Sequence, residues 1–156
     1  VVKRTPLMKS ISPGAISRKR KNSWAHREAV FEHFRSKKAF AKWDEQMLHD
    51  YIDHGTFDGI AAGEDSRELS FDRDVETAIY NTLPHNLGAL LRKHPLKCKA
   101  AFIGGRQSAE MKRVGMAMTE QVTKGRITML DGTHLFPMEK PLATAAAIEA
   151  ALRNLL

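Results

Sequence analysis

The stretch Lys99-Ala-Ala-Phe-Ile-Gly-Gly105, followed by Ile127-Thr-Met-Leu-Asp-Gly-Thr-His134, decides the fold of this chain. Four apolar residues closed by two glycines are too few for a helix and are typical of a strand covered on both faces. Ser108 is placed to cap a helix that ends near Val122, and residues 126–130 form a second apolar strand. Two strands joined by a helix predict a parallel pair with a right-handed crossover.

The residues after the second strand predict a Gly132-x-His134 turn and then a final helix. Pro141 suits the first turn of that helix. Five apolar residues recur at helical spacing along it: Leu142, Ala145, Ile148, Leu152 and Leu155. Residues 96–156 are therefore expected to form a βαβα unit. Two parallel strands bury little surface alone, so the rest of the sheet is expected to come from a segment outside this chain.

Residues 1–95 have a different pattern and are predicted to be mostly helical. The spacing of their apolar residues predicts two helices, over 27–37 and 45–54. The small and polar residues over 59–67 predict a loop instead. The chain is thus expected to divide near residue 96, with a helical cap or lid region before it.

Two aspartates in this first region are expected to begin helices. Asp44 precedes the helix that ends near His54, and Asp74 precedes a helix that reaches about Tyr80. The carboxylate of an N-cap accepts backbone N–H groups that have no partner in the first turn.

Composition limits the classes of protein that need to be considered. The chain has 156 residues, of which 42% are apolar, which suffices for one globular domain. Its single cysteine, Cys98, excludes an internal disulfide and indicates a reducing, intracellular compartment. Cys98 precedes an apolar strand and is expected to be a small buried residue. No apolar run approaches the roughly 20 residues that span a bilayer, so no transmembrane segment is expected.

A net charge of +7 raises the alternative of a binding protein for anionic partners. Much of the charge lies in two runs, Arg18-Lys-Arg-Lys21 and residues 92–99. Four consecutive cations can form a nuclear-import signal or a phosphate-binding patch. No aromatic residues are interleaved with them for base stacking, and no recognition motif surrounds them, so nucleic acid is not the expected partner.

Metal and cofactor sites are not predicted. His49 and His54 are five residues apart and have no third ligand nearby in the sequence. We therefore expect no metal ion and no cofactor.

The Gly132-x-His134 turn, followed by Glu139-x-Pro141, resembles the last loop of α/β hydrolases. The chain is similar to the C-terminal half of the fungal branch that includes peroxisomal lipase-like and toxin-biosynthesis hydrolases. Softer similarities to the cap of that branch are the basic run Arg18-Lys-Arg-Lys21, Trp24, Arg27-Glu-Ala29, Phe40 and Trp43. The resemblance implies a partial α/β-hydrolase fold, with a helical cap over 1–95 and the C-terminal βαβα part of the core over 96–156.

The resemblance also implies a function. His134 would be the general base of a serine esterase or lipase-like hydrolase that acts on a small-molecule ester or acyl substrate, in the cytoplasm or the peroxisome. No Gly-x-Ser-x-Gly occurs in the chain, so the nucleophile is expected on a missing N-terminal half. Gly132 and Glu139 are expected to support the loop of the histidine. The alternative is an inactive, truncated hydrolase scaffold that acts as a basic binding module.

The triad acid departs from the pattern of the family. Many members carry an aspartate after the seventh strand, whereas here the first carboxylate after that strand is Glu110. Three explanations are open: an acid just before Val1 and outside this chain, Glu110 reaching over from the first helical turn, or loss of activity. The resemblance favours the first, because related hydrolases place the acid after the sixth strand.

Overall fold

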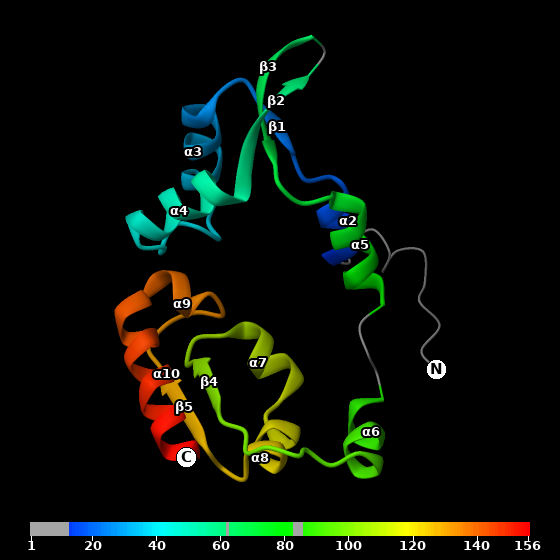
Figure 1. Ribbon diagram of the computed structural model, residues 1–156, viewed down its shortest axis with the longest axis vertical. Coiled ribbons are helices and arrows are strands. Elements are labelled where there is room, and N and C mark those ends of the chain that lie inside the picture. Colours follow the sequence, from blue (N-terminus) through cyan, green and yellow to red (C-terminus); the bar gives the residue numbers. More distant parts are fainter. Residues whose placement is uncertain (1–12, 62, 83–85) are drawn as a thin grey trace. The chain divides into compact units, whose positions relative to one another are not determined.

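The computed structural model describes residues 13–61, 63–82 and 86–156 of a mixed α/β chain (Figure 1). The chain separates into two compact units. The first comprises Val1–Lys37 and His49–His85, and the second comprises Lys38–Leu48 and Asn86–Leu156. Helix α4 (Glu45–Gly55) begins in the second unit and ends in the first.

The first unit contains a three-stranded antiparallel sheet that the sequence did not reveal. Its strands are β1 (Ser23–Trp24), β2 (Thr56–Ala61) and β3 (Glu64–Leu69), in the order β1-β3-β2. The predicted loop over 59–67 is therefore wrong. Gly63, at the turn between β2 and β3, has a φ of 85°, which glycine adopts without strain.

Three predicted helices of the first unit are confirmed, with changes at their ends: α3 (Arg27–Arg35), the second part of α4, and α5 (Arg73–Asn81). Helix α2 (Pro13–Arg18) was not predicted. The carboxylate of Asp44 accepts the backbone N–H groups of Gln46 and Met47, at 3.0 and 3.3 Å, as an N-cap should. At α5 the prediction was wrong by two residues, because Asp72 is the N-cap and accepts the backbone N–H of Asp74.

Aromatic side chains from β1, α3 and α4 form the core of the first unit. Trp24 and Phe34 are buried, with ring centroids 5.6 Å apart, and Phe34 meets Tyr51 edge-on at 5.3 Å. Val30 on α3 and Ile52 on α4 are also fully buried. The apolar face of each helix therefore covers one side of this core.

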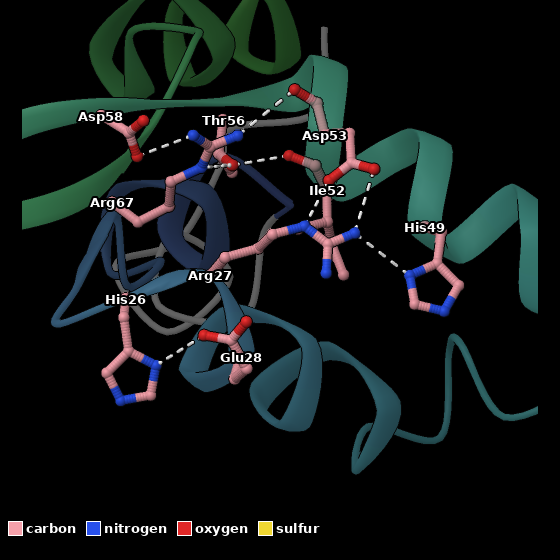
Figure 2. A network of polar contacts seen from close by, with 9 residues as sticks. All are labelled: His26, Arg27, Glu28, His49, Ile52, Asp53, Thr56, Asp58 and Arg67. Atoms are coloured by element: carbon pink, nitrogen blue, oxygen red, sulfur yellow. Dashed lines mark hydrogen bonds and ion pairs between the residues drawn. The ribbon is translucent and has the colours of Figure 1, made fainter.

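A polar network joins α3 to the end of α4 (Figure 2). Arg27 donates two hydrogen bonds to Asp53, at 2.5 and 3.0 Å, and a third to Nδ1 of His49 at 3.2 Å. The ring of His49 also stacks on Phe31, with centroids 4.7 Å apart. The hydrogen bonds from Arg27, followed by its charge, lower the pKa of the Asp53 carboxyl.

Asp53→Asn tests this network through the pH dependence of stability. The lowered pKa means that ionised Asp53 stabilises the folded state above the pKa that the carboxyl has when unfolded, and that this contribution is lost as the pH falls through the lower, folded-state pKa. The difference in unfolding free energy between wild type and Asp53→Asn should be largest near about pH 6 and vanish toward about pH 2. Urea denaturation followed by circular dichroism measures it.

Asp65→Asn is the matched control, because it removes the same charge from an exposed position on β3. Asp65 forms none of the ion pairs seen in the described part of the chain. If the control loses the same unfolding free energy with the same pH dependence, the effect comes from net charge and not from the network.

The second unit is built on a parallel strand pair, as predicted. Strand β4 (Phe102–Gly105) pairs with β5 (Ile127–Leu130) in a register that places Gly104 opposite Met129. The predicted end of the first strand at Ile103 was wrong by two residues, because both glycines take part in the pairing. The parallel direction is the one that a right-handed crossover gives.

The crossover between the strands is two short helices and not one. They are α7 (Ala109–Val114) and α8 (Ala117–Thr123). Gly115, with a φ of 81°, ends the first helix and donates its N–H to the carbonyl of Met111 at 2.8 Å. The prediction of Ser108 as N-cap is confirmed, since its hydroxyl accepts the N–H of Met111.

Three further helices complete the second unit: α6 (Leu87–Lys93), α9 (Phe136–Glu139) and α10 (Pro141–Leu155). The predicted apolar stripe of α10 is largely uncovered, with Leu142 86% and Leu152 58% exposed. Cys98 is exposed, so its prediction as a buried residue was wrong. Among the described residues no helix is long and apolar enough to cross a membrane.

Candidate functional site

Two loops at the carboxyl ends of β4 and β5 form the candidate site. Because the strands are parallel, both loops leave the sheet at the same edge. Backbone hydrogen bonds join them: the N–H of Arg106 donates to the carbonyl of Leu130 at 2.8 Å, and that of Gln107 to Gly132 at 2.9 Å. The loop after β4 is therefore fixed against the turn that carries His134.

Glycines permit this close approach. A Cβ on Gly105 would lie 1.9 Å from the carbonyl oxygen of Thr133, and one on Gly132 would lie 2.7 Å from Cβ of Phe136. The first contact is with backbone, which cannot rotate away as the end of a flexible side chain can. Gly105 is thus required by the position of the histidine turn, and Gly132 by the start of α9.

Glu139 holds the histidine turn from its other side. Its carboxylate accepts the backbone N–H of Thr133 at 2.9 Å and also the hydroxyl of Thr133. The same hydroxyl accepts the N–H of Leu135 at 3.2 Å. Glu139 therefore binds Thr133, the residue just before His134.

His134 faces the residues that follow β4. Its Nδ1 lies 3.1 Å from Oγ of Ser108, and that oxygen lies 3.2 Å from Oε2 of Glu110. Oε2 of Glu110 is 3.9 Å from Nδ1, so the three atoms form a triangle in which only the serine hydroxyl is within hydrogen-bond distance of both other groups. Ser108 is 1% exposed, whereas the side chain of His134 is 57% exposed.

The hydroxyl of Ser108 determines the tautomer of the histidine. A serine hydroxyl has one proton to donate and can accept two hydrogen bonds. A carboxylate only accepts, so the proton of Ser108 goes to Glu110, while the N–H of Met111 fills one acceptor position at 3.2 Å. The remaining contact requires Nδ1 of His134 to be the donor. In the neutral imidazole the lone pair then lies on Nε2.

Glu110 is held in its ionised form. Its own backbone N–H, then the hydroxyl of Ser108 and the nearby charges of His134 and Arg113, lower the pKa of its carboxyl. An ionised carboxylate can only accept hydrogen bonds, so it receives the proton of the Ser108 hydroxyl.

Sequence reasoning identified Ser108 only as a helix cap. Its contact with His134 depends on the strand pairing that brings the two loops together, which local spacing does not show. The pattern Ser108-x-Glu110 at the end of a strand was the available signal, because an N-cap hydroxyl and a carboxylate two residues later can share a proton.

Asp131 is engaged away from the histidine. Its carboxylate accepts a hydrogen bond from the side-chain amide of Gln107 at 2.8 Å, and Lys42 donates to the carbonyl oxygen of the same amide at 3.2 Å. These side chains line an open hollow of about 360 Å³ with Gly132 and Glu139. Asp131 is consequently a support of the loop and not the partner of the imidazole.

The basic run of the first unit is partly neutralised within the fold. Arg20 donates to both carboxylate oxygens of Glu76, at 2.9 and 3.2 Å. The ammonium of Lys21 lies over the ring of Trp24. The run is thus not a continuous row of free cations. In the described part of the chain no three His, Cys, Asp or Glu side chains gather as metal ligands do.

Comparison with known proteins identifies a similar fold among solved structures. No protein-family model and no curated protein matches the chain. Among solved structures it is similar to the peroxisomal α/β-hydrolase Lpx1 (Yor084w) of Saccharomyces cerevisiae, with a TM-score of 0.62 and 14% sequence identity. The match covers 99% of this chain and 44% of the yeast protein, so the chain spans less than half of that hydrolase. At this identity the likeness shows an α/β-hydrolase-like fold.

Gly105→Ala tests the backbone approach that fixes the site. The new methyl group would overlap the carbonyl oxygen of Thr133, so the histidine turn must move away from β4. We expect a loss of about 1–3 kcal/mol in unfolding free energy, as overpacking commonly costs. Amide shifts of residues 131–135 should change in a ¹H–¹⁵N spectrum.

Gly55→Ala is the control for Gly105→Ala. There the added methyl would meet only the ring of Tyr51 at 3.8 Å, an ordinary contact. An unchanged histidine turn in Gly105→Ala would contradict the close approach.

Proposed function

We propose that this chain carries the general base of a serine hydrolase that cleaves an ester or similar acyl bond. The observation that carries the proposal is the state of His134. Its Nδ1 donates to Ser108, and its Nε2 makes none of the hydrogen bonds found among the described residues. An imidazole with an oriented Nδ1–H and an available Nε2 lone pair is what a nucleophilic serine requires.

The proposed reaction has two acyl-transfer steps. A serine hydroxyl attacks the acyl carbonyl while Nε2 of His134 takes its proton, and backbone N–H groups hold the oxyanion. The imidazolium then returns that proton to the leaving alcohol as the carbon–oxygen bond breaks. Water, deprotonated in the same way, releases the acid from the acyl-enzyme and restores the serine.

Glu110 supplies the acid in this proposal, acting through Ser108. The carboxylate is 3.9 Å from Nδ1, beyond direct hydrogen-bond distance, whereas the hydroxyl of Ser108 is within hydrogen-bond distance of both groups. Ser108 is itself unsuited as the nucleophile. It is buried, its proton is donated to Glu110, and it contacts the nitrogen opposite the one that a nucleophile needs.

The nucleophile and the oxyanion donors are proposed to lie on a segment outside these 156 residues. The chain contains no Gly-x-Ser-x-Gly, and it spans 44% of the similar yeast hydrolase. The uncovered apolar side chains of α10, such as Leu142 and Leu152, also support a covering segment. The peroxisomal compartment named for the yeast protein is the proposed location of this one. The substrate is proposed to be a small-molecule ester or acyl compound.

Ser108→Ala tests the orientation of His134 in the chain itself. In the wild type, ¹⁵N spectra of the imidazole should show a protonated Nδ1 and an unprotonated Nε2. The hydroxyl of Ser108 donates its proton to Glu110, so it can only accept a hydrogen bond from the imidazole. In Ser108→Ala that acceptor is gone, and the population should shift toward the Nε2–H form.

Ser36→Ala is the matched control, since the hydroxyl of Ser36 bonds to the carbonyl of His33 in the first unit. It should leave the tautomer of His134 unchanged. A wild-type ring protonated on Nε2 would contradict both the role of Ser108 and the proposed use of Nε2 as the base.

His134→Ala tests the function in a protein that joins this chain to the proposed segment with the nucleophile. Turnover of short p-nitrophenyl esters should fall by about 10³-fold or more, because the loss of a triad member is that costly. The 156-residue chain alone should show no turnover above background.

Lys112→Ala, a change on the outer turn of α7, serves as the activity control and should leave turnover within about twofold. Esterase activity that survives His134→Ala would place the site elsewhere. Inactive extended protein that binds nucleic acid with steep salt dependence through residues 18–21 would favour the basic binding module.

A further inference from the structure

A second hollow in the second unit is lined by cations. It has a volume of about 510 Å³ and lies among α6, the residues just before β4, and α8. Five of its lining residues are basic: Arg92, Lys97, Lys99, Lys124 and Arg126. No acidic residue is among the lining residues. We call this feature the cationic hollow.

Four of the five charges of the cationic hollow have no anionic partner in the described part of the chain. Arg92, Lys97, Lys124 and Arg126 take part in none of the ion pairs found there. Arg126 donates to the neutral carbonyl of Thr123 at 3.0 Å, and Lys99 lies 3.5 Å from a backbone oxygen of Leu156, the last of these residues. The repulsion among the cations therefore remains largely uncompensated, and an anion in the hollow would relieve it.

The hollow also has an apolar part. Leu91, Met118 and Val122 line it together with the basic residues. Its volume is within the range of sites that hold small organic ligands. A ligand with an anionic group and a compact apolar body would therefore match both kinds of lining.

The cationic hollow is distinct from the candidate site at His134. Its lining residues precede either β4 or β5, whereas His134 follows the end of β5, and the two strands are parallel. Within the second unit the two features therefore lie at opposite ends of the strand pair, with α8 near the start of β4 and α9 after the end of β5 (Figure 1).

We propose that the cationic hollow binds the phosphate group of a small organic phosphate. Arginine and lysine side chains are the usual donors to phosphate oxygens, and both types are present. The same phosphate chemistry is offered by a soluble phosphate ester and by the headgroup of an anionic lipid.

The single cysteine of the chain provides the assay. Cys98 is exposed and lines the cationic hollow. Its alkylation by iodoacetamide, a neutral reagent, can be followed by mass spectrometry in the whole 156-residue chain. Sodium pyrophosphate should slow the reaction saturably, whereas sodium chloride at the same ionic strength should not.

Two double variants distinguish binding at the cationic hollow from a general effect of net charge. Lys97→Gln with Lys99→Gln removes two cations of the hollow, and the pyrophosphate concentration for half protection should rise about tenfold or more, as the loss of one strong charged contact implies. Lys112→Gln with Arg113→Gln removes two cations from α7, outside the hollow, and should leave that concentration unchanged. For each variant, the alkylation rate with pyrophosphate is divided by the rate without it. Changes in the intrinsic reactivity of Cys98 therefore cancel.

A second arm identifies the source of the phosphate. Vesicles of phosphatidylcholine with and without phosphatidic acid replace pyrophosphate in the same assay. Protection by pyrophosphate alone supports a soluble phosphate ester, and protection by phosphatidic acid supports a lipid headgroup. Absence of protection in both arms, or equal loss in the two variant pairs, would overturn the proposal.

Discussion

The close approach of two backbone segments, at Gly105 and at Thr133, is the constraint on which the candidate site depends. Parallel pairing of β4 and β5 brings both strand ends to one edge, and only a residue without Cβ fits between the strand and the turn. The main-chain hydrogen bonds of Arg106 and Gln107 then fix the two loops together. The position of His134 relative to Ser108 follows from backbone geometry before any side-chain contact is made.

Local signals in the sequence were sufficient for the parts of the fold that local interactions determine. The caps at Asp44 and Ser108 act on donors two or three residues away, so their effect can be deduced from spacing alone. The parallel strand pair was predicted because two short apolar runs flank a helical segment. The position of His134 after the second strand followed from the same pattern.

Interactions between distant residues could not be deduced in this way. Strand β3 is polar except at Leu69, and the hairpin that it forms with β2 is held by backbone pairing and by contacts of Arg67 with Thr56 and Asp58 (Figure 2). Polar composition over 59–67 therefore suggested a loop, although Gly63 marked the turn. The link from Glu110 through Ser108 to His134 joins residues 26 positions apart and appears only after the strands pair.

The hydroxyl of Ser108 both caps α7 and contacts the imidazole of His134. Oγ of Ser108 caps α7 at Met111, donates to Glu110 and accepts from His134, so its three hydrogen-bonding positions are all used. Because each position is filled, the hydroxyl cannot rotate to a second arrangement without breaking a contact. The orientation of the imidazole is therefore set by residues of the second unit, and its Nε2 makes none of the hydrogen bonds found among the described residues.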